Sequence, residues 1–212
     1  KKAGTFGIIS VFSFNATKLA MSGQGGCLCT NDYKIYKKAK LYSHHGLNKK
    51  NTSKYFWSDV LGYQYSWTNI QAALAYAQMK RINSLIKKKR EIYKNYKKLL
   101  KGIKGVILNE SENKSRPTNW ISYLNFSNLY KFKKEKLITE VQKHNIDLRP
   151  IFYPLSSMPT FKKYVNQKKI KKVNYQSYQL SKKGVCLPSG NDLNFKDQIH
   201  VVKVLKKVLS KL

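Results

Sequence analysis

The chain has 212 residues with 42 basic and 10 acidic side chains, a formal net charge of +32. Such a charge raises nucleic acids and anionic membranes as partners, but 38 of the basic residues are lysines spread along the whole length, without an arginine-rich binding motif. No apolar stretch is long enough to span a membrane, and three cysteines form no disulfide framework. We therefore interpret the charge as a compositional bias of a solvated surface, and the sequence favours a cytoplasmic protein with no specific nucleic-acid or membrane partner.

The first feature in chain order is a lysine between an apolar run and a glycine cluster. Residues 8–12 (IISVF) predict a buried strand, and residues 26–30 predict a second strand after the glycines. Lys18 lies between them, where limited water would disfavour its ammonium form and favour the nucleophilic amine that a Schiff-base lysine needs. Ser13 offers a hydroxyl that could bind a phosphate. On spacing alone, a solvated lysine in a glycine-rich turn is the simpler interpretation.

The next elements are expected to be helical. Residues 32–43 predict a helix capped by Asn31 or Asp32, and residues 47–66 predict a polar, aromatic loop. A long helix is expected from Thr68 to about residue 100 without a clear break, which suits a passage between two domains. Its expected first apolar face consists of Ile70, Ala73, Leu74 and Ala77, and its later solvent face consists of Lys87, Lys88, Lys89 and Arg90.

The remaining residues alternate between strand and helix patterns. We expect strands at 106–108, 120–124, 147–152 and 184–188, and helices at 133–144, 176–183 and 195–212. This mixture predicts an α/β small domain.

Three segments resemble the DegT/DnrJ/EryC1/StrS nucleotide-sugar aminotransferases. The runs SFNATK (13–18) and GQGG (23–26) resemble the family's Ser-Phe-x-Ala-Thr-Lys and Gly-Glu-Gly-Gly, which surround the cofactor lysine. Residues 61–73, LGYQYSWTNIQAA, resemble its Gly-Tyr-Asn-Tyr-Arg-Met-Thr-Asn-x-Gln-Ala-Ala segment. Residues 149–159, RPIFYPLSSMP, are similar to the GDP-perosamine synthase branch. The similarity covers nearly the whole chain.

The resemblance implies an α/β fold, namely the C-terminal part of a fold-type I aminotransferase. Residues 1–84 would be the remainder of a mostly parallel-sheet large domain, and residues 85–212 would be the small domain. The segments that supply an aspartate to the pyridine nitrogen and a stacking aromatic ring have no counterpart in this sequence. We therefore expect a C-terminal fragment that is inactive alone and prone to aggregate.

The resemblance also implies the site and the reaction. Lys18 would hold pyridoxal 5'-phosphate, and Ser13 and Gln64 would bind its phosphate, with Gln64 reaching the neighbouring subunit of a homodimer. Arg149 and Tyr153 would line the sugar pocket, with a packing role equally open for both. The implied reaction transfers an amino group from glutamate to a nucleotide-linked keto-sugar, a 4-keto-6-deoxyhexose, for cell-surface polysaccharides such as lipopolysaccharide O-antigen. No metal is expected.

Three alternatives stay open. Gln24, Gln64 and Ser66 replace the family's glutamate, asparagine and arginine, which keeps a degenerate, non-catalytic homologue open. Dehydratases of the superfamily carry histidine in place of the lysine, and Lys18 argues against that branch. A basic nucleic-acid-binding protein would need aromatic residues interleaved with arginine on one surface.

Overall fold

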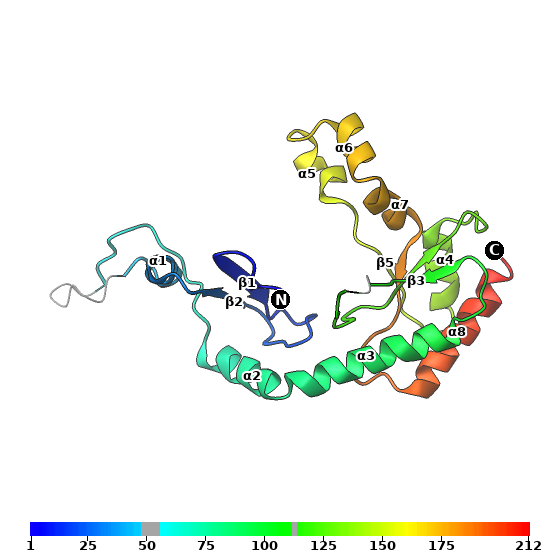
Figure 1. Cartoon of the computed structure of the whole chain (residues 1–212), viewed down its shortest axis with the longest axis horizontal. Coiled ribbons are helices and arrows are strands. Elements are labelled where there is room, and N and C mark those ends of the chain that lie inside the picture. Colours follow the sequence, from blue (N-terminus) through cyan, green and yellow to red (C-terminus); the bar gives the residue numbers. More distant parts are fainter. Residues whose placement is uncertain (48–55, 112–113) are drawn as a thin grey trace. The chain divides into compact units, whose positions relative to one another are not determined.

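The computed structural model describes residues 1–47, 56–111 and 114–212. The chain divides into two compact units, Lys1–Leu85 and Ile86–Leu212, whose elements are labelled in Figure 1. Each unit is described by itself. Part of the loop expected at 47–66 falls on residues 48–55, which lie outside the described residues.

The first unit contains a β-hairpin and two helices. Strands β1 (Ile9–Ser13) and β2 (Gly26–Thr30) pair antiparallel, with Ser13 opposite Gly26. Helix α1 (Tyr33–Ser43) begins as the sequence predicts, because Asp32 accepts hydrogen bonds from the backbone amides of Lys34 at 2.7 Å and Ile35 at 3.0 Å. The predicted helix start is thus confirmed.

Residues 8–12 were predicted to form a buried strand, and the predicted burial is wrong. Val11 is 78% exposed and Phe12 is 44% exposed. Among the described residues, β1 pairs only with β2, and a two-stranded ribbon has no second layer to cover its faces. The strand itself forms where it was expected.

The long helix expected from Thr68 is two helices, α2 (Asn69–Lys80) and α3 (Ile82–Leu99). Thr68 and Gln71 form a capping box at the start of α2, and the backbone leaves helical geometry at Arg81, with φ −107° and ψ 15°. The predicted apolar face of α2 is also wrong, since Ile70 is 76% exposed. Ala75 is buried instead, because it packs in a small cluster with Phe14 and Ala20.

The second unit is built on a four-stranded antiparallel sheet in the order β3-β4-β6-β5. The strands are β3 (Val106–Leu108), β4 (Tyr123–Phe126), β5 (Arg149–Pro150) and β6 (Val185–Cys186). The helices are α4 (Lys134–Gln142), η1 (Leu155–Ser157), α5 (Pro159–Lys162), α6 (Gln167–Val173), α7 (Tyr175–Lys183) and α8 (Phe195–Leu209). The α/β class is confirmed, and every strand pairing among the described residues is antiparallel.

Several predicted boundaries shift in this unit. The strand expected at 120–124 begins only at Tyr123, and the strand expected at 147–152 has two residues. The short helices η1, α5 and α6 were not predicted, because each is too short to show a helical period. On α8, Val202, Leu205 and Leu209 are buried, whereas Ile199 is 42% exposed.

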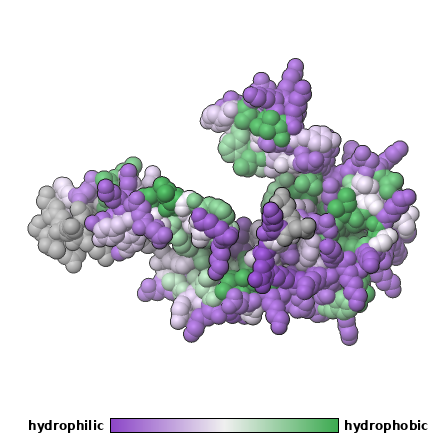
Figure 2. Space-filling view, in the orientation of Figure 1, coloured by the Kyte–Doolittle hydropathy of each residue, from purple (hydrophilic) through white to green (hydrophobic). Residues whose placement is uncertain are grey.

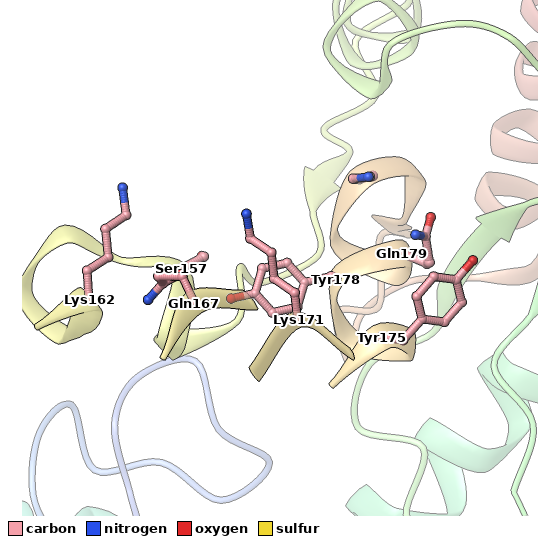
Figure 3. Close-up of a pocket in the computed structure, with 8 residues that line it drawn as sticks. Ser157, Lys162, Gln167, Lys171, Tyr175, Tyr178 and Gln179 are labelled. Carbon is pink, nitrogen blue, oxygen red and sulfur yellow. The ribbon is translucent and has the colours of Figure 1, made fainter. Parts of the chain in front are cut away.

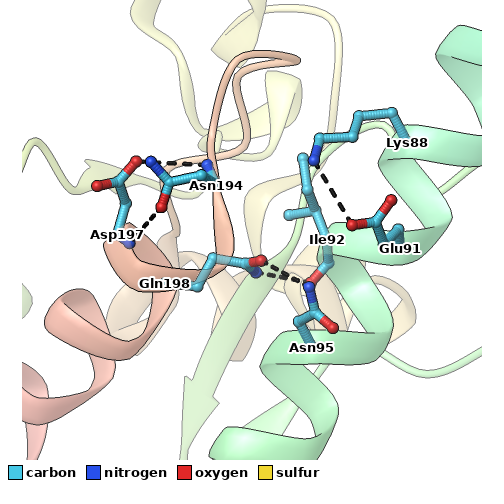
Figure 4. A network of polar contacts seen from close by, with 7 residues as sticks. All are labelled: Lys88, Glu91, Ile92, Asn95, Asn194, Asp197 and Gln198. Carbon is cyan, nitrogen blue, oxygen red and sulfur yellow. Dashed lines mark hydrogen bonds and ion pairs between the residues drawn. The ribbon is translucent and has the colours of Figure 1, made fainter.

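A buried polar network joins α3 to α8 in the core of the second unit. The fully buried Gln198 donates from Nε2 to the carbonyl oxygen of Ile92 at 2.8 Å and accepts from Asn95 Nδ2 at 3.0 Å, as Figure 4 shows. The same view shows the capping box in which Asn194 and Asp197 start α8. These bonds satisfy the amide of Gln198 away from water and fix the two helices together.

Lys89 corrects the expectation of a solvent-facing run at 87–90. Lys89 is only 7% exposed, and its ammonium group donates a hydrogen bond to the backbone carbonyl oxygen of Ser189. Burial lowers the pKa of Lys89 because it disfavours the charged form, and the nearby Asp192 carboxylate opposes that shift. One lysine of the run is therefore structural.

Hydrophilic residues cover much of the visible surface, interrupted by hydrophobic patches (Figure 2). In the described part of the chain, no helix combines the length and hydropathy needed to cross a bilayer. Within the same residues, no group of three or more His, Cys, Asp or Glu side chains is placed to hold a metal ion.

Candidate active site

Lys18 lies in the loop that connects β1 to β2. Backbone hydrogen bonds continue the hairpin into this loop, from the Phe14 amide to the Gly25 carbonyl at 2.9 Å and from the Ala16 amide to the Gly23 carbonyl at 2.8 Å. Ser22 is buried, and its amide donates to the Phe14 carbonyl at 2.8 Å. The loop therefore has a defined backbone course on either side of Lys18.

Asn15 organises the turn that carries Lys18. Its side-chain oxygen accepts from the amide of Thr17 at 3.2 Å and from its hydroxyl at 3.1 Å. The backbone carbonyl oxygen of Asn15 accepts from the backbone amide of Lys18 at 2.9 Å. Its Nδ2 donates to Oε1 of Gln24 at 3.2 Å. A neutral amide at position 24 thus supplies an acceptor that holds the two sides of the loop together.

Ser13 ends β1, and Lys18 lies in the loop that follows it. Ser13 is exposed, and its hydroxyl oxygen accepts a hydrogen bond from the Asn15 amide at 3.3 Å. This leaves the hydroxyl hydrogen for an anionic acceptor. Lys18 is half-buried, between the limited water expected for a Schiff-base lysine and the fully solvated alternative. Pyridoxal phosphate carries an aldehyde, which a primary amine can attack, and a phosphate, to which a hydroxyl can donate a hydrogen bond. The side chains of Lys18 and Ser13 therefore fit that cofactor.

Trp67 packs against the loop that carries Lys18. Its ring meets Phe14 edge-on, with centroids 5.0 Å apart. A Cβ atom on Gly25 would lie 1.7 Å from Trp67 Nε1, so the indole packs directly on the Gly25 backbone, whose φ is +107°. Among the described residues, this buried Nε1 has no hydrogen-bond partner.

Gln64 lies on a separate extended segment beside the end of α1. Tyr63 and Tyr65 donate from their amides to the carbonyls of Tyr42 at 2.7 Å and Ser43 at 3.0 Å, and Gln64 forms an isolated bridge with His44. The rings of Tyr63 and Tyr65 stack with centroids 5.0 Å apart. Since side chains alternate along an extended chain, Gln64 projects from the opposite side of the segment.

Ser66 also has a local partner. Its hydroxyl donates to the Ser43 carbonyl at 3.1 Å. Gln24, Gln64 and Ser66, which differ from the family's residues, thus lie in segments with defined backbone hydrogen bonds. None of the three replaces the lysine at position 18.

Arg149 and Tyr153 lie in the second unit. The Arg149 side chain is 76% exposed, and its Nε is 3.2 Å from Asp147 Oδ2. Tyr153 is 53% exposed, and the ammonium of the buried Lys134 lies 4.2 Å from the centre of its ring. Both side chains face solvent in their own unit, which is compatible with contact to a ligand.

Comparisons with known proteins show which proteins this chain resembles. The profile of the DegT/DnrJ/EryC1/StrS aminotransferase family matches residues 1–206. GDP-perosamine synthase from Vibrio cholerae is 31% identical over 189 residues, which cover 89% of this chain and 49% of that protein. The putative pyridoxal phosphate-dependent aminotransferase EpsN from Bacillus subtilis is 27% identical over 205 residues, with 97% and 51% coverage.

The fold has solved counterparts. The structure of Helicobacter pylori PseC, an aminotransferase involved in the biosynthesis of pseudoaminic acid, superposes with a TM-score of 0.87 at 22% identity. The superposition covers 100% of this chain and 56% of that one. The chain thus spans about half the length of the proteins that it matches.

Proposed function

The chain belongs to the DegT/DnrJ/EryC1/StrS aminotransferase family, and we propose that it forms the C-terminal portion of a pyridoxal-phosphate-dependent sugar-nucleotide aminotransferase. The single observation that carries the proposal is the position of Lys18 in the ordered loop between β1 and β2, close in the chain to Ser13 at the end of β1. The bound cofactor would supply an electron sink for the carbon that loses its proton.

The residues of this chain have separate roles in the proposal. The Lys18 amine anchors the cofactor and, once released, moves a proton at the substrate carbon, so one group is both nucleophile and general acid/base. Ser13 donates its hydroxyl to the cofactor phosphate. Arg149 and Tyr153 contact the sugar nucleotide, with glutamate as the amino donor.

The proposed acceptor is a nucleotide-linked 4-keto-6-deoxyhexose. The support is the segment 149–159 and the 31% identity to GDP-perosamine synthase from Vibrio cholerae. The amino sugar formed would serve cell-surface polysaccharide synthesis, such as that of O-antigen, from the cytoplasm. Residues 1–84 would complete the cofactor-binding domain, and residues 85–212 would form the small domain.

Labelling tests the role of Lys18. The protein at its full natural length is loaded with pyridoxal phosphate, reduced with borohydride and mapped by mass spectrometry. We expect the pyridoxyl group on Lys18, loss of label and activity in Lys18→Ala, and retention of both in Lys40→Ala, an exposed lysine of α1. Label on another lysine would refute the assignment, and no label on an otherwise folded protein would favour a degenerate homologue.

We further propose a homodimer in which Gln64 reaches the partner's phosphate site. Its segment carries the stacked Tyr63 and Tyr65, and amphipathic aromatic side chains are enriched at interfaces. Mixed full-length Lys18→Ala and Gln64→Ala subunits should regain activity, because one site of each heterodimer would be intact. Absence of recovery after proven subunit exchange, with both single variants impaired, would show that each site is built within one chain.

A further inference from the structure

Two cysteines lie side by side on strand β2. Cys27 and Cys29 are separated by one residue, so their side chains point to the same face of the strand, and their Sγ atoms are 3.9 Å apart. Both thiols are free, and Cys29 is exposed while Cys27 is half-buried. The residues opposite them on β1 are Phe12 and Ser10. This face of the hairpin therefore presents two sulfur atoms together, with no carboxylate among the opposite residues.

The distance between the two sulfur atoms suits a shared metal ion better than a disulfide. A disulfide needs an S–S distance of about 2.05 Å, so the strand would have to bend to form one. Two metal–thiolate bonds of about 2.3 Å span the observed 3.9 Å at an S–metal–S angle of about 115°. That angle lies between those of tetrahedral and trigonal coordination. Both thiolates can therefore bind one ion without a change in the strand.

The kind and number of ligands select the ion. Thiolates are soft ligands, which favour Cu(I) and Zn(II) over hard cations. Structural zinc sites use four ligands. Among residues 1–47, 56–111 and 114–212, no group of three or more His, Cys, Asp or Glu side chains is placed to hold a metal ion. Cu(I) is stable with fewer ligands than zinc, so a pair of thiolates is enough for it.

The surroundings hold Cys27 in place and keep its thiol protonated. Cys27 packs against the small apolar cluster of Phe14, Ala20 and Ala75. Burial raises the pKa of the Cys27 thiol, and the neighbouring Cys29 raises it further through a hydrogen bond and through charge. A protonated thiol reacts slowly with oxidants and electrophiles, but a metal ion can displace its proton. The pair is therefore better suited to metal binding than to rapid oxidation.

A cavity in the second unit provides a contrast. Its lining side chains belong to lysine, glutamine, serine and tyrosine residues of η1, α5, α6 and α7, as Figure 3 shows. These groups are ammonium ions, amides and hydroxyls, which are poor ligands for a soft metal ion. The thiol pair on β2 therefore offers a soft metal ion the better ligands of the two places.

We propose that Cys27 and Cys29 together bind one Cu(I) ion. Two S–H bonds break and two Cu–S bonds form, copper keeps its oxidation state, and two protons pass to solvent. The resulting bis-thiolate complex carries one negative charge, which the net charge of +32 on this chain favours. The site uses neither Lys18 nor amino transfer, so its test is independent of the proposed function.

A competition for Cu(I) tests the proposal. The protein at its full natural length is reduced and titrated, without oxygen, with Cu(I) held by the coloured chelator bicinchoninate. The Cu(I) retained per chain should fall by one equivalent in Cys27→Ser and in Cys29→Ser. The reason is that a single thiolate binds the ion at least about a hundredfold more weakly than a chelating pair. Calorimetry in buffers of different ionisation enthalpy should count two protons released for that equivalent.

Two control variants separate binding from folding. Leu28→Ser changes the 42% exposed residue between the two cysteines and keeps both thiols, so it should retain the full amount of Cu(I). Cys186→Ser removes a half-buried cysteine of the second unit and should also retain it. Full retention in Cys27→Ser or Cys29→Ser, or an equal loss in Cys186→Ser, would overturn the proposal. Binding of Zn(II) as tight as that of Cu(I) would overturn the choice of ion, because it would require ligands beyond the pair.

Discussion

Substitution of Gly25 by alanine is the most direct test of how the structure holds Lys18. The new Cβ would lie 1.7 Å from Trp67 Nε1, and the backbone φ of +107° is one that residues with a side chain rarely adopt. Gly23 is the matched control, because its φ is +81° but a Cβ there would meet nothing within 4 Å. The two variants share the backbone strain and differ in the clash.

The expected magnitudes follow from these two terms. Positive φ alone should cost Gly23→Ala about 1–2 kcal/mol in the free energy of unfolding. Gly25→Ala should cost about 1–3 kcal/mol more, because the indole must move away from its packing against Phe14. Trp67→Leu should relieve the added part, giving a coupling between positions 25 and 67 of about 0.5–3 kcal/mol.

Urea denaturation followed by circular dichroism, on the protein at its full natural length, measures these costs. Visible absorbance after loading with pyridoxal phosphate reports whether Lys18 keeps its position. We expect Gly25→Ala to lose most of that absorbance and Gly23→Ala to retain it. Equal destabilisation of the two variants, or additive effects of Gly25→Ala and Trp67→Leu, would refute the packing of Trp67 on the loop.

Three further outcomes are expected. Gln198→Leu should cost about 1–3 kcal/mol by denaturation, because it leaves the Asn95 amide unpaired next to the core; an unchanged stability would contradict the network. The pKa of Lys89 is lowered by burial from its usual 10.5, so the unfolded chain binds more protons below that pH. The free energy of unfolding should therefore rise with pH up to about 10.5, and this component should be absent in Lys89→Met. Alkylation followed by mass spectrometry should modify the exposed Cys29 before Cys186, whose thiol pKa is raised by burial.

The amino-acid sequence determined the features that depend on neighbouring residues. Asp32 caps α1 and Thr68 caps α2 through residues within three positions of themselves, so the capping role of Asp32 and the helix start at Thr68 were predicted. The runs around Ser13 and Lys18 identified a strand, a loop and a second strand, because strand pattern and glycine positions are local properties. Ser13 ends β1 and Lys18 lies in the loop that follows, so the structure keeps these two predicted site residues in neighbouring parts of one hairpin.

The tertiary structure decided what depends on partners far along the chain. Lys89 lies in a lysine run that looks solvated, yet its ammonium reaches the Ser189 carbonyl, one hundred residues away. Trp67 is distant from Gly25 in the sequence, and only the folded structure shows that its indole packs on the Gly25 backbone. The predicted burial of β1 was wrong because an apolar sequence shows only that a strand could be buried. Whether it is buried depends on a second layer of structure that covers it.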